Sequence, residues 1–222
     1  MVGQFFVLSQ TIKTKEAQMQ YRAVQNRCAV HLASLSLPIT DTESLAILKT
    51  KGFRVLEVDL IALARQCIKV SIYRRGAKPS EAPTVVDCSS FIKWLYGQRG
   101  IWLPRRSIQQ RELGIPVPIE EVSAGDVIFV SGWIDYYHSD PKDGVGHVGI
   151  ATGEGTVIHA ADRKAHVVES SFESFIGKSK FRGARRYVPK DQTVFTLETP
   201  LDREVEIADD LRWIVLQLLP KR

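Results

Sequence analysis

One cysteine and two histidines lie in surroundings that could support nucleophilic chemistry. Cys88 lies in the stretch DCSSF, His147 in GHVGI and His159 in VIHA. A thiol, a base and a group that orients the base are the parts of a cysteine nucleophile. If the fold brings these three side chains together, the chain is a hydrolase that cleaves amide bonds.

The segment that begins at Cys88 has the apolar spacing of a helix, and Asp87 is a suitable N-terminal cap for it. The first turn of a helix leaves backbone N–H groups unpaired, and the helix dipole is positive there. Both effects stabilise a thiolate, so we expect the pKa of this thiol to lie below the free value of about 8.5. The same N–H groups could bind the oxyanion of a tetrahedral intermediate.

Both histidines lie in short strand-like runs. Alternation along a strand places His147 on the face opposite Val148 and Ile150, and the flanking glycines leave room for another element to approach. His159 lies in the next run of this kind. A strand, a turn and a second strand could therefore set the two imidazoles side by side, with one orienting the other.

Other interpretations stay open when each residue is taken alone. A single buried cysteine or strand histidine is more often structural than catalytic. One cysteine and two histidines could also fill three positions of a zinc site, although the sequence has no C-x-x-C or H-E-x-x-H pair. Cys28 and Cys67 are expected to be buried, and His31, His138 and His166 lack comparable surroundings.

The composition is that of an ordinary globular protein. The 222 residues are 44% hydrophobic and 25% charged, with a net charge of +5. The basic residues are mostly scattered, which argues against nucleic-acid binding, and three cysteines do not make a disulfide framework. The sequence has no signal-peptide core and no run of about 18 apolar residues, so we expect neither a standard export signal nor a membrane span.

The hydrophobic pattern predicts helices first and short strands afterwards. The expected elements are a β-like entry at 4–8, helices over 15–35, 40–52 and 55–72 and from Ser89, strands at 126–130, 147–152, 157–159, 166–169 and 184–188, and a last helix over 207–218. This order favours an α+β architecture, with N-terminal helices packed on a small antiparallel β-sheet. We expect a mostly helical N-terminal extension (1–53), a catalytic domain (54–190) and a C-terminal extension with an amphipathic helix (191–222).

Taken together, these motifs resemble the NlpC/P60 family of papain-like cysteine peptidases. The similar segments are the helix that leads to Tyr73, the DCS motif, the LPR turn followed by Ser107 and Gln110, the AGDVIF run, and the GHVGI and VIHA strands. The resemblance implies a papain-like fold, a nucleophile at Cys88, a general base at His147 and an orienting residue at His159, with no metal or organic cofactor. It further implies binding roles for Tyr73 at the oxyanion and for Asp87 and Ser89 along the substrate groove.

The resemblance also implies a substrate class. Family members typically cut the bond between γ-D-glutamate and a diamino acid in peptidoglycan stem peptides or muropeptides, and some cut between muramic acid and L-alanine. A related papain-like enzyme could instead deamidate a protein or transfer an acyl group, and a non-catalytic wall-binding module is an alternative from another class. Iodoacetamide labelling of Cys88 well below pH 8 would argue against that last alternative.

The sequence departs from the family pattern in three places. Ser90 stands where the Cys motif usually has glycine, and a serine fits the first turn of a helix. The link over 131–146 is longer than usual, so the rim of the cleft is expected to differ. The family usually acts at the bacterial cell envelope, but no export signal or wall-binding repeat is visible in the sequence, so the compartment stays open. The sequence does not indicate the oligomeric state either.

Overall fold

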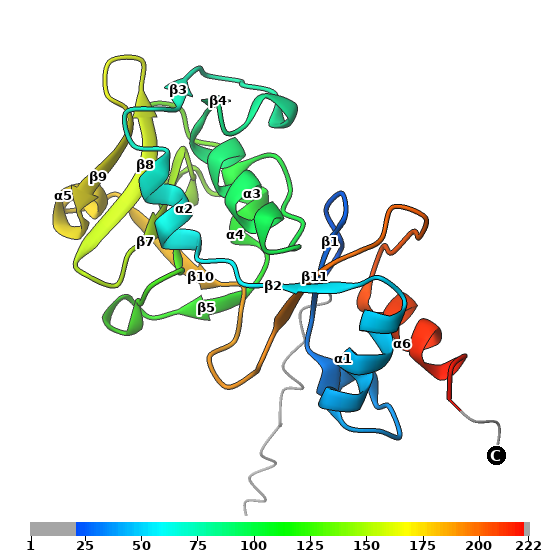
Figure 1. The fold of residues 1–222 in the computed structure, drawn as a ribbon. Helices are drawn as coiled ribbons and strands as arrows, with labels where there is room; N and C mark the ends of the chain where they lie inside the picture. The colour runs from blue at the N-terminus through cyan, green and yellow to red at the C-terminus, as the bar shows by residue number, and fades with distance from the viewer. Residues whose placement is uncertain (1–20, 220–222) are drawn as a thin grey trace, which may run out of the picture.

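The structure is a computed structural model, and it describes residues 21–219 (Figure 1). The β-like entry expected at 4–8 lies outside the described residues. The fold mixes helices with an antiparallel sheet, as expected of an α+β protein. The elements fall into a central group that carries the expected site residues and a second group built from both ends of the described chain.

The central group is organised by a six-stranded sheet with the order β5-β10-β6-β7-β8-β9, in which every neighbouring pair is antiparallel. Its strands are β5 (Ile115–Val117), β6 (Val127–Val130), β7 (His147–Ala151), β8 (Thr156–Asp162), β9 (His166–Ser171) and β10 (Phe181–Arg186). The last five correspond to the strands expected from the alternating pattern. The interior of β6, β7 and β8 is almost fully buried, because helices cover one face and a second apolar cluster covers the other.

The helices of the central group are α2 (Leu60–Gln66), α3 (Cys88–Gln98), α4 (Ser107–Arg111) and α5 (Phe172–Ile176). Helix α3 packs against β7 and β8 and buries Phe91, Ile92 and Leu95 in the main core. Short parallel strands β3 (Ile72–Tyr73) and β4 (Val85–Val86) lie next to its start. The helix expected over 55–72 is shorter in the structure, because Arg54–Leu56 forms the strand β2 instead.

The second group joins the two ends of the described chain in one small sheet, with the order β1-β11-β2. Strand β1 (Arg27–Val30) pairs with β11 (Phe195–Glu198), which also pairs with β2. Helices α1 (Asp41–Thr50) and α6 (Ala208–Leu216) pack on each other beside this sheet, at the lower right of Figure 1. These elements share their own apolar cluster, which includes Leu48, Leu197 and Leu211.

The prediction of a helix over 15–35 is wrong for those of its residues that the structure describes. Residues 27–30 form β1, and a 3-10 turn follows at Leu32–Leu35. The strand depends on hydrogen bonds to β11 at the far end of the chain, so the local sequence pattern does not predict it. By contrast, α1 begins where its capping residues predict, because Thr40 accepts a hydrogen bond from Glu43 N while the Glu43 carboxylate accepts one from Thr40 N. The last helix, α6, is also confirmed.

Candidate active site

Cys88 is the first residue of α3, and the helix start is fixed by reciprocal hydrogen bonds. Asp87 accepts a hydrogen bond from Ser90 N at 2.9 Å, and Ser90 Oγ accepts one from Asp87 N at 2.8 Å. Ser90, where the family usually has glycine, therefore completes the capping box. The structure confirms that Cys88 lies at a helix start, as its capping residue Asp87 predicted. The cysteine is partly exposed there.

Asp87 and Ser89 are both engaged by one guanidinium. Arg105 donates to both carboxylate oxygens of Asp87 and to Ser89 Oγ at 2.9 Å, and it also donates to the Ala77 carbonyl at 2.7 Å. The carboxylate of Asp87 also accepts from Gly76 N at 3.1 Å. These bonds tie the 75–77 loop to the start of α3, so Asp87 holds the wall of the site as well as lining it.

His147 and His159 are brought together by the register of β7 and β8. The pairing of Ile150 with Ile158 places Gly149 opposite His159, and the two histidines lie diagonally on one face of the sheet. His147 Nε2 lies 2.9 Å from His159 Nδ1. A Cβ at Gly149 would meet Val157 Cγ1 at 2.5 Å and His159 Cβ at 3.1 Å, so this position needs glycine for lack of space.

Two residues that sequence reasoning missed support the histidine pair. Ser170 Oγ, on β9, lies 3.0 Å from His159 Nε2 and extends the chain of polar contacts. The ring of Phe175, on α5, lies 5.5 Å from that of His147 and 4.8 Å from that of His159. The strand expected at 166–169 stops short of Ser170, and only the register of β8 and β9 reveals which residue Ser170 meets.

Burial shifts the pKa values of the Cys88 thiol and of the two imidazoles. It raises the pKa of the Cys88 thiol to about 12, and the Asp87 carboxylate acts in the same direction, while the backbone N–H groups of Ser89 and Val148 and the Arg105 charge oppose the rise. The expectation of an acidified thiol is therefore wrong, because the effect of burial outweighs that of the helix start. Burial likewise lowers the pKa of His147 to about 3 and that of His159 to about 4.

Tyr73 lies near Cys88, at the end of the short strand β3. Its backbone N–H donates to His166 Nδ1 at 3.1 Å, and the left-handed backbone of His166, with φ of 58°, belongs to the turn that enters β9. Burial raises the pKa of the Tyr73 phenol, and the nearby Cys88 is the next largest cause. His166, expected on an exposed strand, is half-buried and links the β8–β9 turn to β3.

The thiol, the two imidazoles and the Tyr73 phenol share a cleft of about 1190 Å³. One side is the long 131–146 loop, in which Trp133 is 97% exposed. Asp135 fixes the start of this loop by accepting from Gly132 N at 2.7 Å, and Asp143 fixes its end through a paired contact with Arg111. These contacts hold the 131–146 loop in place as one wall of the cleft.

The other residues singled out in the sequence lie away from this cleft. Cys28 and Cys67 are buried among apolar side chains, as expected. His138 contacts Glu112 on the exposed side of the 131–146 loop, and His31 precedes the 3-10 turn after β1. Within residues 21–219, no three His, Cys, Asp or Glu side chains are arranged to hold a metal ion. None of the helices in this range is both long enough and apolar enough to cross a membrane.

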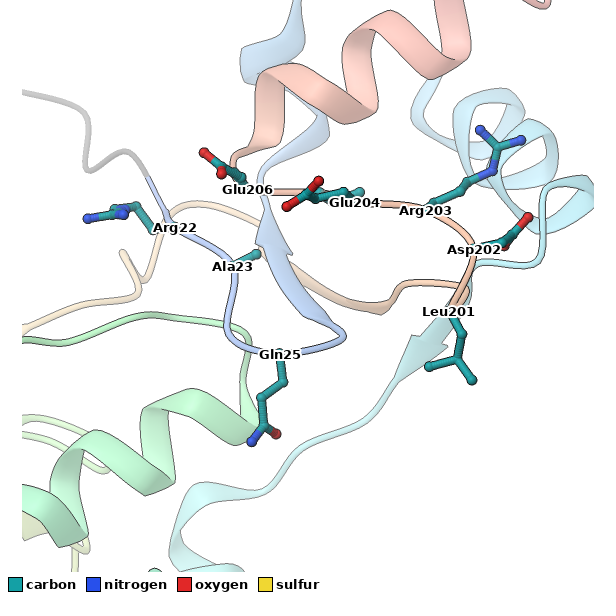
Figure 2. Close-up of a pocket in the computed structure, with 9 residues that line it drawn as sticks. Arg22, Ala23, Gln25, Leu201, Asp202, Arg203, Glu204 and Glu206 are labelled. Atoms are coloured by element: carbon teal, nitrogen blue, oxygen red, sulfur yellow. The ribbon is translucent and has the colours of Figure 1, made fainter. Parts of the chain in front are cut away.

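A second hollow, of about 610 Å³, lies between the turn before β1 and the 201–206 segment (Figure 2). The Ala23 N–H donates to the Glu206 carbonyl at 2.7 Å, which joins the two walls through the backbone. In this view the Arg22 side chain points to the left, and those of Gln25 and Leu201 both point toward the lower edge. This hollow contains neither cysteine nor histidine.

Comparison with known proteins assigns the family. The profile of the NlpC/P60 family matches residues 71–186, which include Tyr73, Cys88, His147 and His159. The chain belongs to the NlpC/P60 family. Its NlpC/P60 segment covers β3 to β10, the part of the fold that forms the cleft.

Two curated relatives are similar to this NlpC/P60 chain. It is 34% identical over 105 residues to a γ-D-glutamyl-L-lysine dipeptidyl-peptidase of Bacillus cereus, a match that covers 46% of this chain and 29% of the relative. It is 31% identical over 148 residues to a γ-DL-glutamyl hydrolase of Bacillus subtilis, covering 64% of this chain and 33% of the relative. The chain thus spans about a third of the length of these relatives.

Two solved structures overlap with the NlpC/P60 segment. An NlpC/P60 family protein of Bacillus cereus is 27% identical with a TM-score of 0.47, and the overlap covers 59% of this chain and 40% of that one. The NlpC/p60 domain of the peptidoglycan hydrolase SagA is 25% identical with a TM-score of 0.45, and the overlap covers 57% of this chain and 95% of that one.

Proposed function

We propose that the chain is a cysteine hydrolase that cleaves amide bonds in peptidoglycan stem peptides, at the bond between γ-D-glutamate and the diamino acid. The observation that carries this proposal is the shared cleft of Cys88 with the hydrogen-bonded pair His147 and His159. The names of both curated relatives refer to γ-glutamyl bonds, which supports the choice of bond. We assign catalysis to residues 54–190 and leave the extensions without a chemical role.

The contacts of the histidines favour one arrangement of protons. His147 Nε2 faces His159 Nδ1, which leaves His147 Nδ1 as the ring nitrogen available to the thiol. Nδ1 acts as a base only if the proton of neutral His147 resides on Nε2 and is donated to His159 Nδ1. His159 then carries its proton on Nε2 and donates it to Ser170 Oγ. His159 and Ser170 are in this way positioning residues for the base.

The reaction follows from a neutral thiol beside a neutral imidazole. Burial keeps the pKa of the thiol high and that of His147 low, so the proton stays on the sulfur before the reaction. It moves to His147 Nδ1 only as the sulfur attacks the substrate carbonyl. The imidazolium then protonates the leaving amine, and a thioester with Cys88 remains. Water that gives its proton to His147 hydrolyses this thioester, which releases the acid and restores the thiol.

The oxyanion of each tetrahedral intermediate needs donors near Cys88. The first turn of α3 supplies backbone N–H groups, and the Tyr73 phenol lines the same cleft with a pKa that burial keeps high, so it stays a donor at neutral pH. Asp87 and Ser89 line the groove next to these donors. Their contacts with Arg105 support a role in holding the groove in shape.

Purified disaccharide tripeptides and free tripeptides, incubated side by side, test the proposed substrate. The expected products, identified by mass, are the free diamino acid and L-alanyl-D-glutamate, which stays on the sugar when the disaccharide tripeptide is the substrate. Release of the whole stem peptide from the sugar would instead indicate cleavage next to L-alanine. If the purified protein leaves every muropeptide intact but deamidates or acylates other proteins, the proposal is overturned.

A further inference from the structure

The short strand β3, which carries Tyr73, is paired with another strand along one edge only. On that edge, Ile72 N donates to the Thr84 carbonyl at 2.8 Å. Arg74 N likewise donates to the Val86 carbonyl at 2.9 Å. Because N–H groups alternate between the two edges of a strand, Tyr73 N points away from β4. In the described residues this sheet has no strand beyond β3, so the Tyr73 N–H needs another acceptor.

The side chain of His166 supplies this acceptor. Its Nδ1 atom accepts the hydrogen bond from Tyr73 N at 3.1 Å, so the neutral ring carries its proton on Nε2. The backbone joins the same two segments, since Lys69 N donates to the Val167 carbonyl at 3.2 Å. His166 therefore takes the place of a neighbouring strand, at the one residue of β3 that lines the catalytic cleft.

His166 makes this contact from a strained backbone. Its φ of 58° lies in the left-handed region, which is unfavourable for a residue with a Cβ atom and which glycine adopts freely. The turn that leads to it is fixed by Asp162, whose carboxylate accepts from Lys164 N at 2.7 Å and from Ala165 N at 2.9 Å. Strained residues cluster at functional sites, and this one contacts the strand that carries Tyr73.

Tyr73 is held between two contacts in the cleft that it shares with Cys88. On one side, β3 is aligned with β4, where Val86 is the register partner of Tyr73 and only Asp87 separates it from Cys88. On the other side, His166 holds Tyr73 N. The two contacts together fix the position of the Tyr73 backbone, and with it that of the phenol, relative to the start of α3.

We infer that His166 is a positioning residue for the reaction, which holds the Tyr73 phenol at the oxyanion through the hydrogen bond from Tyr73 N to its Nδ1 atom. This inference rests on the proposed function and adds a residue to its machinery. An oxyanion donor contributes only when it lies within hydrogen-bond distance of the charge that develops in the transition state. A displaced β3 should therefore lower kcat and leave KM nearly unchanged.

Two variants of His166 separate its side chain from its backbone. H166G removes the acceptor but relieves the left-handed strain, so kcat on disaccharide tripeptides should fall roughly tenfold while Tm shifts by less than about 4 °C. H166N keeps an acceptor oxygen in the place of Nδ1 and tolerates this φ, so kcat should stay within about threefold of the wild type.

K69G is the matched control for the relief of strain. Lys69 has a φ of 61° at the same junction, but its side chain is exposed and does not line the cleft. In K69G, kcat should stay within about twofold of the wild type.

A double-mutant cycle with Y73F tests whether His166 acts through the phenol. Y73F alone should lower kcat roughly a hundredfold, the usual effect of losing an oxyanion donor. If His166 acts by placing that phenol, H166G should lower the kcat of Y73F by less than about a further twofold. A tenfold loss from H166G in both backgrounds would mean that His166 acts elsewhere, and it would overturn the inference.

The remaining outcomes separate this inference from the proposed function. Wild-type kcat in H166G, a folded H166N as slow as H166G, or an equal loss in K69G overturns the role of His166 and leaves the hydrolase proposal standing. A loss in H166G that comes with a large fall in Tm would make the role structural, which also overturns the inference. If the wild type cleaves no muropeptide, the proposed function is overturned and this inference with it.

Discussion

The catalytic cleft and the hollow in Figure 2 are both open depressions lined by charged side chains, yet they differ in how those side chains are held. In the cleft, the register of two strands sets His147 against His159, and Phe175 shields both rings from water. In the hollow, the side chains of Arg22, Gln25 and Leu201 do not meet one another, and a backbone hydrogen bond joins the walls.

The difference shows what converts a depression into a reactive site. Convergence of side chains lets one group orient another, and burial shifts the pKa of each group by removing water. The cleft has both features, because Cys88 and His147 are shifted in opposite directions around a shared cavity. The hollow has charges without such convergence, so we expect it to tolerate substitution.

The largest effect should come from removing the reacting groups. C88A and H147A should each lower kcat/KM on muropeptides by roughly a thousandfold or more, since the acyl-enzyme or its base is lost. R203Q/E204Q, in the hollow, should leave kcat/KM within about twofold of the wild type, as is usual for surface substitutions. Turnover by C88A at the wild-type rate would exclude the mechanism, and a loss in R203Q/E204Q would break the contrast between the two regions.

A second prediction tests the register that joins the histidines. In G149A, the new methyl group would collide with Val157 and His159, so the imidazoles should separate and kcat should fall roughly a hundredfold. G97A on α3 is the matched control, because its methyl group would meet only the Val24 side chain, at 3.2 Å. The histidine ring resonances in NMR spectra should move in G149A alone. Full activity in G149A would mean that the pair tolerates displacement.

A third prediction concerns pH. His147 must be neutral to accept the proton, and its pKa is lowered to about 3, so activity should persist well below the ordinary imidazole value of about 6.5 and fall only as the pH approaches the lowered pKa. In F175A, water reaches both rings, the pKa of His147 should rise, and the acid limb of kcat/KM should move to higher pH. F175L retains most of the apolar side chain over the two rings, so it should shift the acid limb of kcat/KM less than F175A does.

Stability must be followed over the same range, because the histidines are coupled to folding. The pKa values of His147 and His159 are lower in the folded chain than in the unfolded one, so protonation favours unfolding. Their contribution to stability is complete above about pH 6.5 and is lost progressively as the pH falls toward their folded values. Thermal melting at each pH separates this loss of stability from titration of the base.

The role of burial has its own test. An acid limb of kcat/KM at the same pH in the wild type and in F175A would contradict it.

Local signals in the sequence were sufficient to predict the helix start at Cys88 and the strands that follow it. The cap at Asp87, the helical period after Cys88 and the alternation around His147 each depend on neighbours within one or two turns. The structure places all three features as expected. The acidity of the thiol could not be predicted in this way, because its pKa depends on how much water the folded cleft excludes.

Features that depend on distant parts of the chain were not predictable. Strand β1 exists because β11 pairs with it from the far end of the chain, so residues 27–30 were expected to be helical. Ser170 likewise becomes a partner of His159 only through the register of β8 and β9, and Phe175 covers the histidines from a separate helix. The sequence around one partner can predict a strand, but it does not show which distant residue that strand will meet.

The smallest expected effect concerns Ser170, the outermost member of the polar chain. In S170A, His159 loses the acceptor for its Nε2 proton, so the tautomer that makes His147 Nδ1 a base is favoured less. One hydrogen bond of this kind contributes about 0.5–1.5 kcal/mol, so kcat should fall roughly two- to tenfold while KM stays constant. S170T keeps a hydroxyl group and should restore most of kcat, which a purely structural defect would not do. An unchanged kcat in S170A would show that the hydrogen bond to Ser170 does not help to orient the base. The difference in reactivity between the cleft and the hollow would then depend only on the thiol and the two imidazoles.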